Sequence, residues 1–167
     1  MSRLFVCLWP PEEVVTELEE LHRKDQVGAR FLPPQNWHVT LRFVGNADPN
    51  EVAGALDRAV FEPTEVTLGP AVDIGNGGTL FVPARGADDL AASVVAATRH
   101  LGDQPIRSRF LGHVTLARLK KRANMPRALG ELVSASWTAT EVALVESTLR
   151  PDGARYDTLQ TWPIPTS

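Results

Sequence analysis

A chain of 167 residues suits one ordinary domain, or two small lobes that share a core, and its 43% of hydrophobic residues is typical of globular proteins. No apolar run is long enough to cross a bilayer and the first residues show no cleavable signal pattern, so we expect a cytoplasmic protein with no membrane partner. The net charge of -3, taken alone, argues against nucleic acid, and the single cysteine, Cys7, excludes a disulfide framework. We expect Cys7 to be a core residue and not a nucleophile.

In chain order, the first half is predicted to run strand, helix, strand, helix, strand. The apolar run 4–9 is the first strand, and 11–24 has the spacing of an amphipathic helix. Residues 38–41 lie in the next strand. Residues 48–51, Asp-Pro-Asn-Glu, combine an N-cap, a proline at the first helical position and an acid at the third, so a helix is expected to begin there. A strand at 64–72 closes this half.

The second half repeats this order. Phe81-Val82 repeats Phe5-Val6, the helix of 87–101 follows, and then comes the strand that contains 113–116. Asn124-Met125-Pro126 is expected to open a second helix. The half closes with a predicted hairpin whose two strands, 139–149 and 155–162, are joined by the turn sequence Pro-Asp-Gly-Ala.

These correspondences predict a duplication, with repeats of about 1–74 and 75–167. The connector Gly75-Asn76-Gly77-Gly78 is too short to separate independent domains, so we expect two pseudo-symmetric lobes of one domain, 1–167. A pseudo-twofold arrangement would place the equivalent strands on either side of a central cleft.

The most informative feature is the tetrapeptide His-Val-Thr-Leu, which occurs at 38–41 and again at 113–116. Side chains alternate between the faces of a strand, so the histidine and threonine of each copy share one face. Two imidazoles meet the needs of phosphodiester hydrolysis without a metal, because one ring takes a proton from water while the other gives a proton to the leaving oxygen. Zinc is disfavoured, since neither copy has a second histidine, a cysteine pair or an acid at ligand spacing. The candidate site residues are His38, Thr40, His113 and Thr115.

Basic residues surround the second copy and would suit a polyanionic substrate. For the run 120–122 alone, a solvated loop is an equally good interpretation. The basic residues are Arg107, Arg109, Arg118, Lys120, Lys121, Arg122 and Arg127.

Two arginines close to the motifs are distinguished by strand parity. Arg42 has the parity of His38 and Thr40, so an unbulged strand aims it into the cleft, where its guanidinium would meet phosphate. Arg118 has the opposite parity to His113, so it is expected behind the sheet or in a structural ion pair unless a bulge reorients it.

Four further side chains with rings are candidates for structural roles. Tyr156 and Trp37 are equally suited to stacking on a nucleobase and to packing in the core or at the cleft rim. His22 and His100 lie in helical segments without a partner motif, so we expect surface or satisfied core histidines.

With the motifs and the duplication established, the chain resembles the two-histidine phosphoesterase superfamily, and within it the RNA 2′,3′-cyclic phosphodiesterases historically called 2′-5′ RNA ligases. The resemblance covers nearly the whole chain, and paired motifs are far more specific than one His-x-Thr. The residues that carry it are Arg3-Leu4-Phe5-Val6, Trp9-Pro10-Pro11-Glu12, the segments 37–45 and 113–118, and Gly153-Ala154-Arg155-Tyr156.

The resemblance implies an α+β protein whose two antiparallel sheets form a central cleft, with helices outside and both motifs at the cleft floor. It implies no metal and no organic cofactor, and a substrate that is RNA or an oligonucleotide with a 2′,3′-cyclic phosphate end. We expect a monomer, although the sequence does not fix the oligomeric state. The implied reaction is hydrolysis to a 2′-phosphomonoester, with weak reversal that joins RNA ends through a 2′-5′ linkage. By family practice His38 is the proton donor and His113 the proton acceptor, although the pseudo-symmetric sequence does not itself assign these roles.

Three further residues near the histidines are Thr40, Thr115 and Gly112. Thr40 and Thr115 offer hydroxyl donors on stiff β-branched side chains, and we expect them to hold the phosphoryl group. Gly112 departs from the family pattern, because many members have proline before the second histidine. Glycine frees the backbone that proline would restrain.

Two other functions stay open. The same chemistry would serve a cyclic nucleotide, an ADP-ribose cyclic phosphate or a 2′-5′ oligonucleotide, and the basic segment favours a polymeric end only modestly. A noncatalytic nucleotide-binding module would use the same cleft, although binding alone does not require two proton-transfer groups. Measuring turnover against binding separates these classes.

Overall fold

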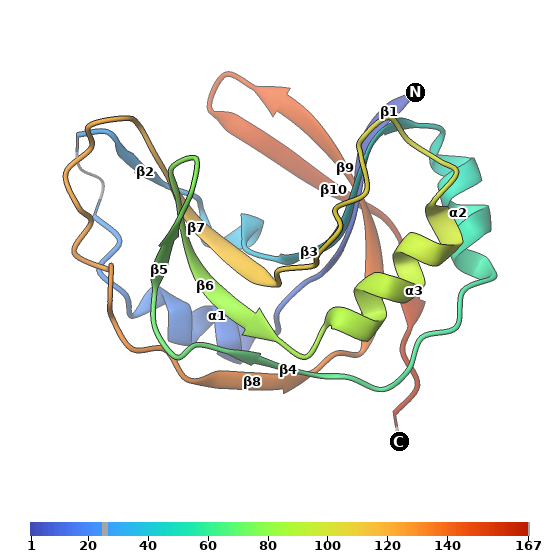
Figure 1. Cartoon of the computed structure of the whole chain (residues 1–167), viewed down its shortest axis with the longest axis horizontal. Coiled ribbons are helices and arrows are strands. Elements are labelled where there is room, and N and C mark those ends of the chain that lie inside the picture. Colours follow the sequence, from blue (N-terminus) through green and yellow to red (C-terminus); the bar gives the residue numbers. More distant parts are fainter. Residues whose placement is uncertain (25–26, 167) are drawn as a thin grey trace.

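The computed structural model describes residues 1–24 and 27–166 of the chain. Its strands form an antiparallel sheet that curls into a half-barrel, with helices on the outside (Figure 1). The elements in chain order are β1 (Ser2–Leu8), α1 (Glu12–Glu19), β2 (Ala29–Phe31), the 3₁₀ turn η1 (Pro34–Asn36), β3 (Val39–Ala47), α2 (Pro49–Asp57), β4 (Glu65–Leu68), β5 (Asp73–Gly75), β6 (Thr79–Arg85), α3 (Asp88–Thr98), β7 (His113–Leu119), β8 (Ala135–Thr138), β9 (Glu141–Arg150) and β10 (Gly153–Pro163).

The strand order brings the two copies of the tetrapeptide together. Neighbouring strands follow the order β10-β9-β1-β3-β7-β6-β4-β8, with β2 paired to β7 and β5 paired to β6. The motif strands β3 and β7 meet through one registered antiparallel pair, Val39 and Val114. The motif strands are therefore neighbours at the centre of the curl, whereas the sequence suggested strands on opposite sides of a cleft.

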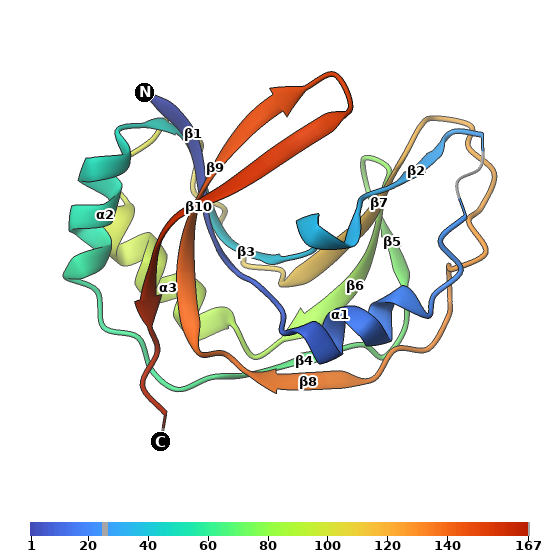
Figure 2. The same ribbon diagram turned by 180° about the vertical axis from the view of Figure 1, so that it is seen from behind.

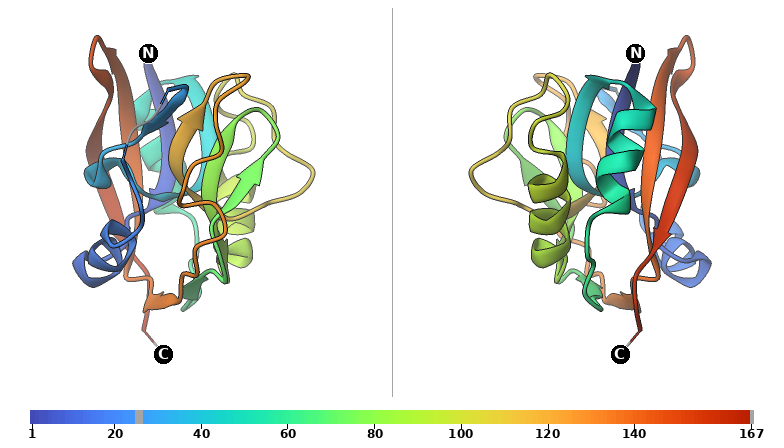
Figure 3. Two further views of the ribbon diagram at one scale, coloured as in Figure 1. Left: turned by 90° about the vertical axis from the view of Figure 1, so that its left-hand side faces the viewer. Right: turned by 90° about the vertical axis from the view of Figure 1, so that its right-hand side faces the viewer.

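The two ends of the sheet diverge from this central junction. The β9–β10 hairpin rises on one side and the β2–β7 pair on the other, which is visible from the front and from behind (Figures 1 and 2). Helices α2 and α3 lie against each other at one end of the molecule, and α1 lies in the opposite half, beside β8 (Figures 1 and 3). Among the described residues, no helix combines the length and the apolar character needed to cross a membrane.

The helices form where the sequence signals lie, although two of them are shorter than predicted. Asp48 caps α2 by accepting a hydrogen bond from the backbone N–H of Asn50 at 2.9 Å, and Pro49 is the first helical residue, as expected. Helix α1 ends at Glu19, and α3 covers Asp88–Thr98 of the predicted 87–101. Each helix buries an apolar side against the sheet, which is where most of its stability comes from.

The predicted helix that begins at Asn124-Met125-Pro126 is wrong. Only an isolated turn forms there, in which the N–H of Leu129 bonds to the Pro126 carbonyl at 3.1 Å. The backbone that follows pairs with the strand-like segment 70–72 instead. The N–H of Val72 bonds to Glu131 O at 2.9 Å and that of Gly130 to Val72 O at 3.0 Å. These bridges take the backbone groups that a helix would need.

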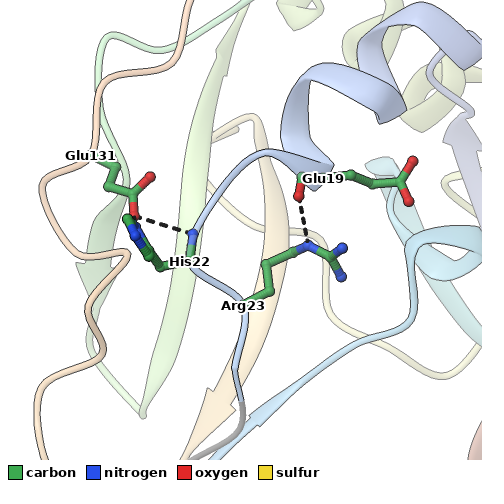
Figure 4. A network of polar contacts seen from close by, with 4 residues as sticks. All are labelled: Glu19, His22, Arg23 and Glu131. Atoms are coloured by element: carbon green, nitrogen blue, oxygen red, sulfur yellow. Dashed lines mark hydrogen bonds and ion pairs between the residues drawn. The ribbon is translucent and has the colours of Figure 1, made fainter.

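His22 lies at the surface, as expected, and makes a structural contact. Its backbone N–H donates to Glu131 Oε1 at 3.1 Å and its ring Nδ1 meets the same oxygen (Figure 4). The contact ties the segment after α1 to the loop before β8. The guanidinium Nε of Arg23 donates to the Glu19 carbonyl at 3.3 Å and closes the same turn. His100 is exposed, and Cys7 is fully buried in the sheet, as predicted.

Candidate active site

Each motif histidine makes the same hydrogen bond. His38 Nδ1 donates to the carbonyl of Asn36 at 2.7 Å, and His113 Nδ1 donates to the carbonyl of Leu111 at 2.7 Å. A carbonyl only accepts, so each bond fixes the ring with its proton on Nδ1 and leaves Nε2 for chemistry. Two imidazoles oriented alike by residues two positions earlier are what an acid and base pair requires.

An equivalent phenylalanine lies beside each histidine. The Phe5 ring stacks on His38 with centroids 4.8 Å apart, and the Phe81 ring meets His113 at 5.5 Å. The sequence repeat Phe-Val marked these two positions, although their place in the site was not predicted. A repeat with only a structural role would account for the buried Val and Leu residues of the two motifs. It would not account for a phenylalanine ring beside each imidazole.

His38 is more enclosed than His113. Two further rings meet its edge, Trp9 and Tyr156, each with centroids 5.4 Å from the imidazole. Trp9 is held by its indole N–H, which donates to Thr158 Oγ1 at 3.1 Å. The result is an aromatic cage around one histidine of the pair.

The enclosure changes the acid strength of His38. Burial lowers the pKa of His38 below its ordinary value, the bond to Asn36 opposes that shift, and the positive fields of His113 and Arg118 lower it further. Burial also raises the pKa of the Tyr156 phenol, while Arg118 acts to lower it. The charge of Arg118 therefore acts to lower the pKa of both groups.

A bulge at the leucine of each motif explains which arginine faces the site. Cys7 pairs with Thr40 and Val6 with Arg42, so Leu41 is the extra residue of β3. In β7 the pairs of β6 skip Leu116 in the same way. After each bulge the side chains exchange faces. Arg118 consequently joins the face of His113 and Thr115.

The prediction that Arg42 points into the site is therefore wrong. Arg42 is 6% exposed and lies behind the sheet. Its guanidinium donates to the carbonyl and the hydroxyl of Thr98, the latter at 2.7 Å, and to the Leu101 carbonyl at 2.7 Å. Arg42 thus fixes the end of α3 and the start of the loop that leads to His113.

The sequence left open whether a bulge turns Arg118 toward the site, and the structure has such a bulge, at Leu116. Arg118 is exposed on the strand β7 and faces Arg30 of β2 in register. Phe43 occupies the equivalent place after the first bulge, and packs with Phe5 and Cys7. The two copies thus differ at this position: one carries a cation and the other an aromatic ring.

A family model for the 2′-5′ RNA ligase superfamily matches residues 10–150, which include both histidine motifs. The chain belongs to the 2′-5′ RNA ligase superfamily. A curated relative, the RNA 2′,3′-cyclic phosphodiesterase of Thermus thermophilus, is 30% identical over 97% of this chain and 90% of its own length. The enzyme of the same name from Methanocaldococcus jannaschii is 21% identical over 96% of this chain and 99% of its own length.

Solved structures show the same fold. TT0787 of Thermus thermophilus superposes with a TM-score of 0.81 at 28% identity, and 97% of each chain is covered. LigT of E. coli, crystallised with 3′-AMP, superposes with a TM-score of 0.80 at 23% identity over 99% of each chain. These matches extend over both arms of the curled sheet and are not confined to the motifs.

Trp37 and Gly112, which the sequence indicated as candidate parts of the site, have structural roles. Trp37 is 1% exposed in the core, with the Arg23 guanidinium 5.5 Å from its ring, so it is not a surface for base stacking. Gly112 is required by a close approach, because a Cβ there would lie 2.4 Å from the Ala84 carbonyl oxygen. The Ala84 N–H in turn donates to the Gly112 carbonyl at 2.9 Å and aligns the start of β7.

The remaining groups around the site are hydroxyls and cations. Thr40 and Thr115 are half-buried on the face of the histidines, and neither hydroxyl is engaged by another residue in the described ranges. No group of three or more His, Cys, Asp or Glu side chains in those ranges is placed to hold a metal ion. The exposed basic residues at the two ends of β7 are Arg107, Arg109, Lys120, Lys121 and Arg122.

Proposed function

We propose that this chain hydrolyses the terminal 2′,3′-cyclic phosphate of RNA to a 2′-phosphomonoester, using His38 and His113 as the acid and the base. The observation that carries the proposal is the pair of equivalent Nδ1 bonds, to Asn36 at 2.7 Å and to Leu111 at 2.7 Å. They leave Nε2 of both rings for proton transfer. The names of the curated relatives support the substrate class.

In the proposed reaction, His113 Nε2 takes a proton from a water molecule as the water oxygen attacks phosphorus. The bond from phosphorus to the 3′ oxygen breaks, and His38 Nε2 gives a proton to that oxygen. The product has a 2′-phosphate and a free 3′ hydroxyl. The same sequence of steps, with a 5′ hydroxyl of RNA in place of water, would break the same bond to the 3′ oxygen and join two ends through a 2′-5′ linkage. By microscopic reversibility, its reverse would cleave that linkage back to the cyclic phosphate and the 5′ hydroxyl.

The lowered pKa of His38 is compatible with the donor role. An imidazolium of lower pKa is a stronger acid and gives its proton more readily to a departing alkoxide. The negative charge of a bound cyclic phosphate would favour the protonated ring and so load it with the proton it needs. Arg118 supplies a second cation on the same face, and the hydroxyls of Thr40 and Thr115 are proposed to donate to the nonbridging oxygens.

We also propose that the two halves, about 1–74 and 75–167, are duplicated lobes that form the walls of the substrate cleft. The matching Nδ1 bonds and the matching bulges at Leu41 and Leu116 support this duplication. Exchange of the closing strands supports it too, since β4 of the first half pairs with β6, and β9 of the second pairs with β1.

The experiment is hydrolysis of a short RNA that ends in a 2′,3′-cyclic phosphate, in excess EDTA, with identification of the product isomer. Wild-type protein should form the 2′-phosphate, and His38→Ala and His113→Ala should each lose about 100- to 10,000-fold in rate. Binding without turnover would instead point to a nucleotide-binding module. Loss of activity in EDTA, restored by a divalent cation, would contradict the metal-independent mechanism.

A further inference from the structure

A hollow of about 420 Å³ lies beside the site, between η1 and the tip of the β9–β10 hairpin. Its volume falls in the range of about 300–1,000 Å³ that is usual for small-molecule sites. Asn36 and Tyr156 line the hollow, and both also touch His38, one through its carbonyl at 2.7 Å and the other through its ring at 5.4 Å. The hollow and the surroundings of His38 therefore share two residues and adjoin each other.

Two hydrogen bonds hold the hollow in shape. The amide Nδ2 of Asn36 donates to the Ala154 carbonyl of β10 at 3.1 Å. The guanidinium of Arg30, on β2, reaches the tip of the hairpin and donates to the Asp152 carbonyl at 3.0 Å. Asn36 is 8% exposed, so its bond is protected from solvent. The hairpin tip is thus tied to the segment that carries His38, and the hollow does not have to be assembled by a ligand.

The charges at the hollow favour an anion. Arg150 and Arg155 line it and are exposed, and Arg30 lies at its edge through the bond to Asp152. The opposing charges are the carboxylate of Asp152 and that of Asp157, which lies 3.4 Å from Arg155 Nε. Arg150 has no such carboxylate partner among the described residues. Gln35 adds a neutral amide that can donate to a phosphate oxygen.

We propose that this hollow binds the 5′-phosphodiester of the terminal nucleotide, and so selects RNA ends over mononucleosides. This inference rests on the proposed function, because it assumes that the cyclic phosphate lies between the two histidines. The next phosphate of the strand is then the nearest anion outside the site, and the hollow is the adjoining space with arginines. Guanidinium groups suit phosphate because their donors match its geometry.

The test compares two substrates, a mononucleoside 2′,3′-cyclic phosphate and a dinucleotide with the same cyclic end. Wild-type protein should have the higher kcat/KM for the dinucleotide. In the double variant Arg150→Gln with Arg155→Gln, this preference should fall about tenfold or more, the effect of losing a charge-assisted hydrogen bond. The matched control is Arg58→Gln, at the exposed end of α2 and away from the hairpin tip, which should keep the wild-type preference (Figure 2).

Equal kcat/KM for the two substrates, or an unchanged preference in the double variant, would overturn the hollow as a subsite and leave the proposed function standing. If wild-type protein turns over neither substrate, the proposed function fails, and binding then decides the subsite. Titration with the dinucleotide that ends in a 2′-phosphate should give a Kd about tenfold weaker in the double variant than in the control. Equal Kd values would overturn the subsite as well.

Discussion

Val39 and Val114 lie directly opposite each other in the sheet, at the point where the two motif strands meet. Because the strands are antiparallel at this pair, they run past each other in opposite directions, so the histidine of each copy lies on the side of the threonine of the other copy. One valine pair thus explains how two segments far apart in the sequence come to lie side by side.

We predict that Arg118→Gln lowers kcat/KM by roughly 10- to 100-fold, the cost of one charge-assisted contact to phosphate. Removal of this cation should also raise the pKa of His38, since the Arg118 charge acts to lower it. NMR titration of the imidazole carbon resonances checks this second effect without substrate. An unchanged His38 titration would contradict the proximity of the two side chains.

Arg42 should behave in the opposite way, as a structural residue. Arg42→Met leaves the Leu101 carbonyl without the Arg42 donor and removes one of the two donors to the Thr98 carbonyl, so the free energy of unfolding should fall by about 1–3 kcal/mol. Urea unfolding measures this loss. Arg118→Gln is the matched comparison, because Arg118 is exposed and its loss should leave the urea midpoint nearly unchanged. Equal loss of stability in both variants would contradict the different roles of the two arginines.

Gly112→Ala should be destabilising despite the small size of the added group. Its Cβ would lie 2.4 Å from the Ala84 carbonyl oxygen, so the backbone before His113 must shift, at a cost of about 1–3 kcal/mol. The midpoint temperature of thermal unfolding and kcat should both decrease. Gly54→Ala is the matched control, because nothing lies within 4 Å of its Cβ in α2, and it should gain about 0.5–1 kcal/mol.

The sequence is sufficient to place each histidine on the same strand face as its threonine, because period-two alternation holds from the histidine to the threonine of each motif. The catalytic role of these residues stays a prediction. After the threonine the alternation fails, since a bulge at Leu41 and at Leu116 exchanges the faces. Sequence pattern alone does not reveal a bulge, so for an unbulged strand it directs Arg42 into the cleft, and it directs Arg118 to the site face only if a bulge is present.

The missing helix after the second motif has a similar physical explanation. A cap-like sequence with Pro126 is a local signal, whereas the competing bonds to the segment 70–72 join residues far apart in the chain. Backbone hydrogen bonds between distant segments override this weak local preference for a helix start. The role of Trp37 was undecidable for the same reason, because only the fold determines which face of the preceding turn is covered.

The pH dependence of turnover distinguishes the two histidines. If His38 is the donor, it must be protonated, so kcat/KM should fall as pH rises through the pKa of His38, which lies below the ordinary histidine value. Arg118→Gln should move this alkaline limb to higher pH, because it removes a charge that lowers that pKa. The measurement is kcat/KM against pH for both proteins, with the His38 pKa taken from NMR. If activity instead rises with pH through the His38 pKa, His38 is the base and the assigned roles are reversed.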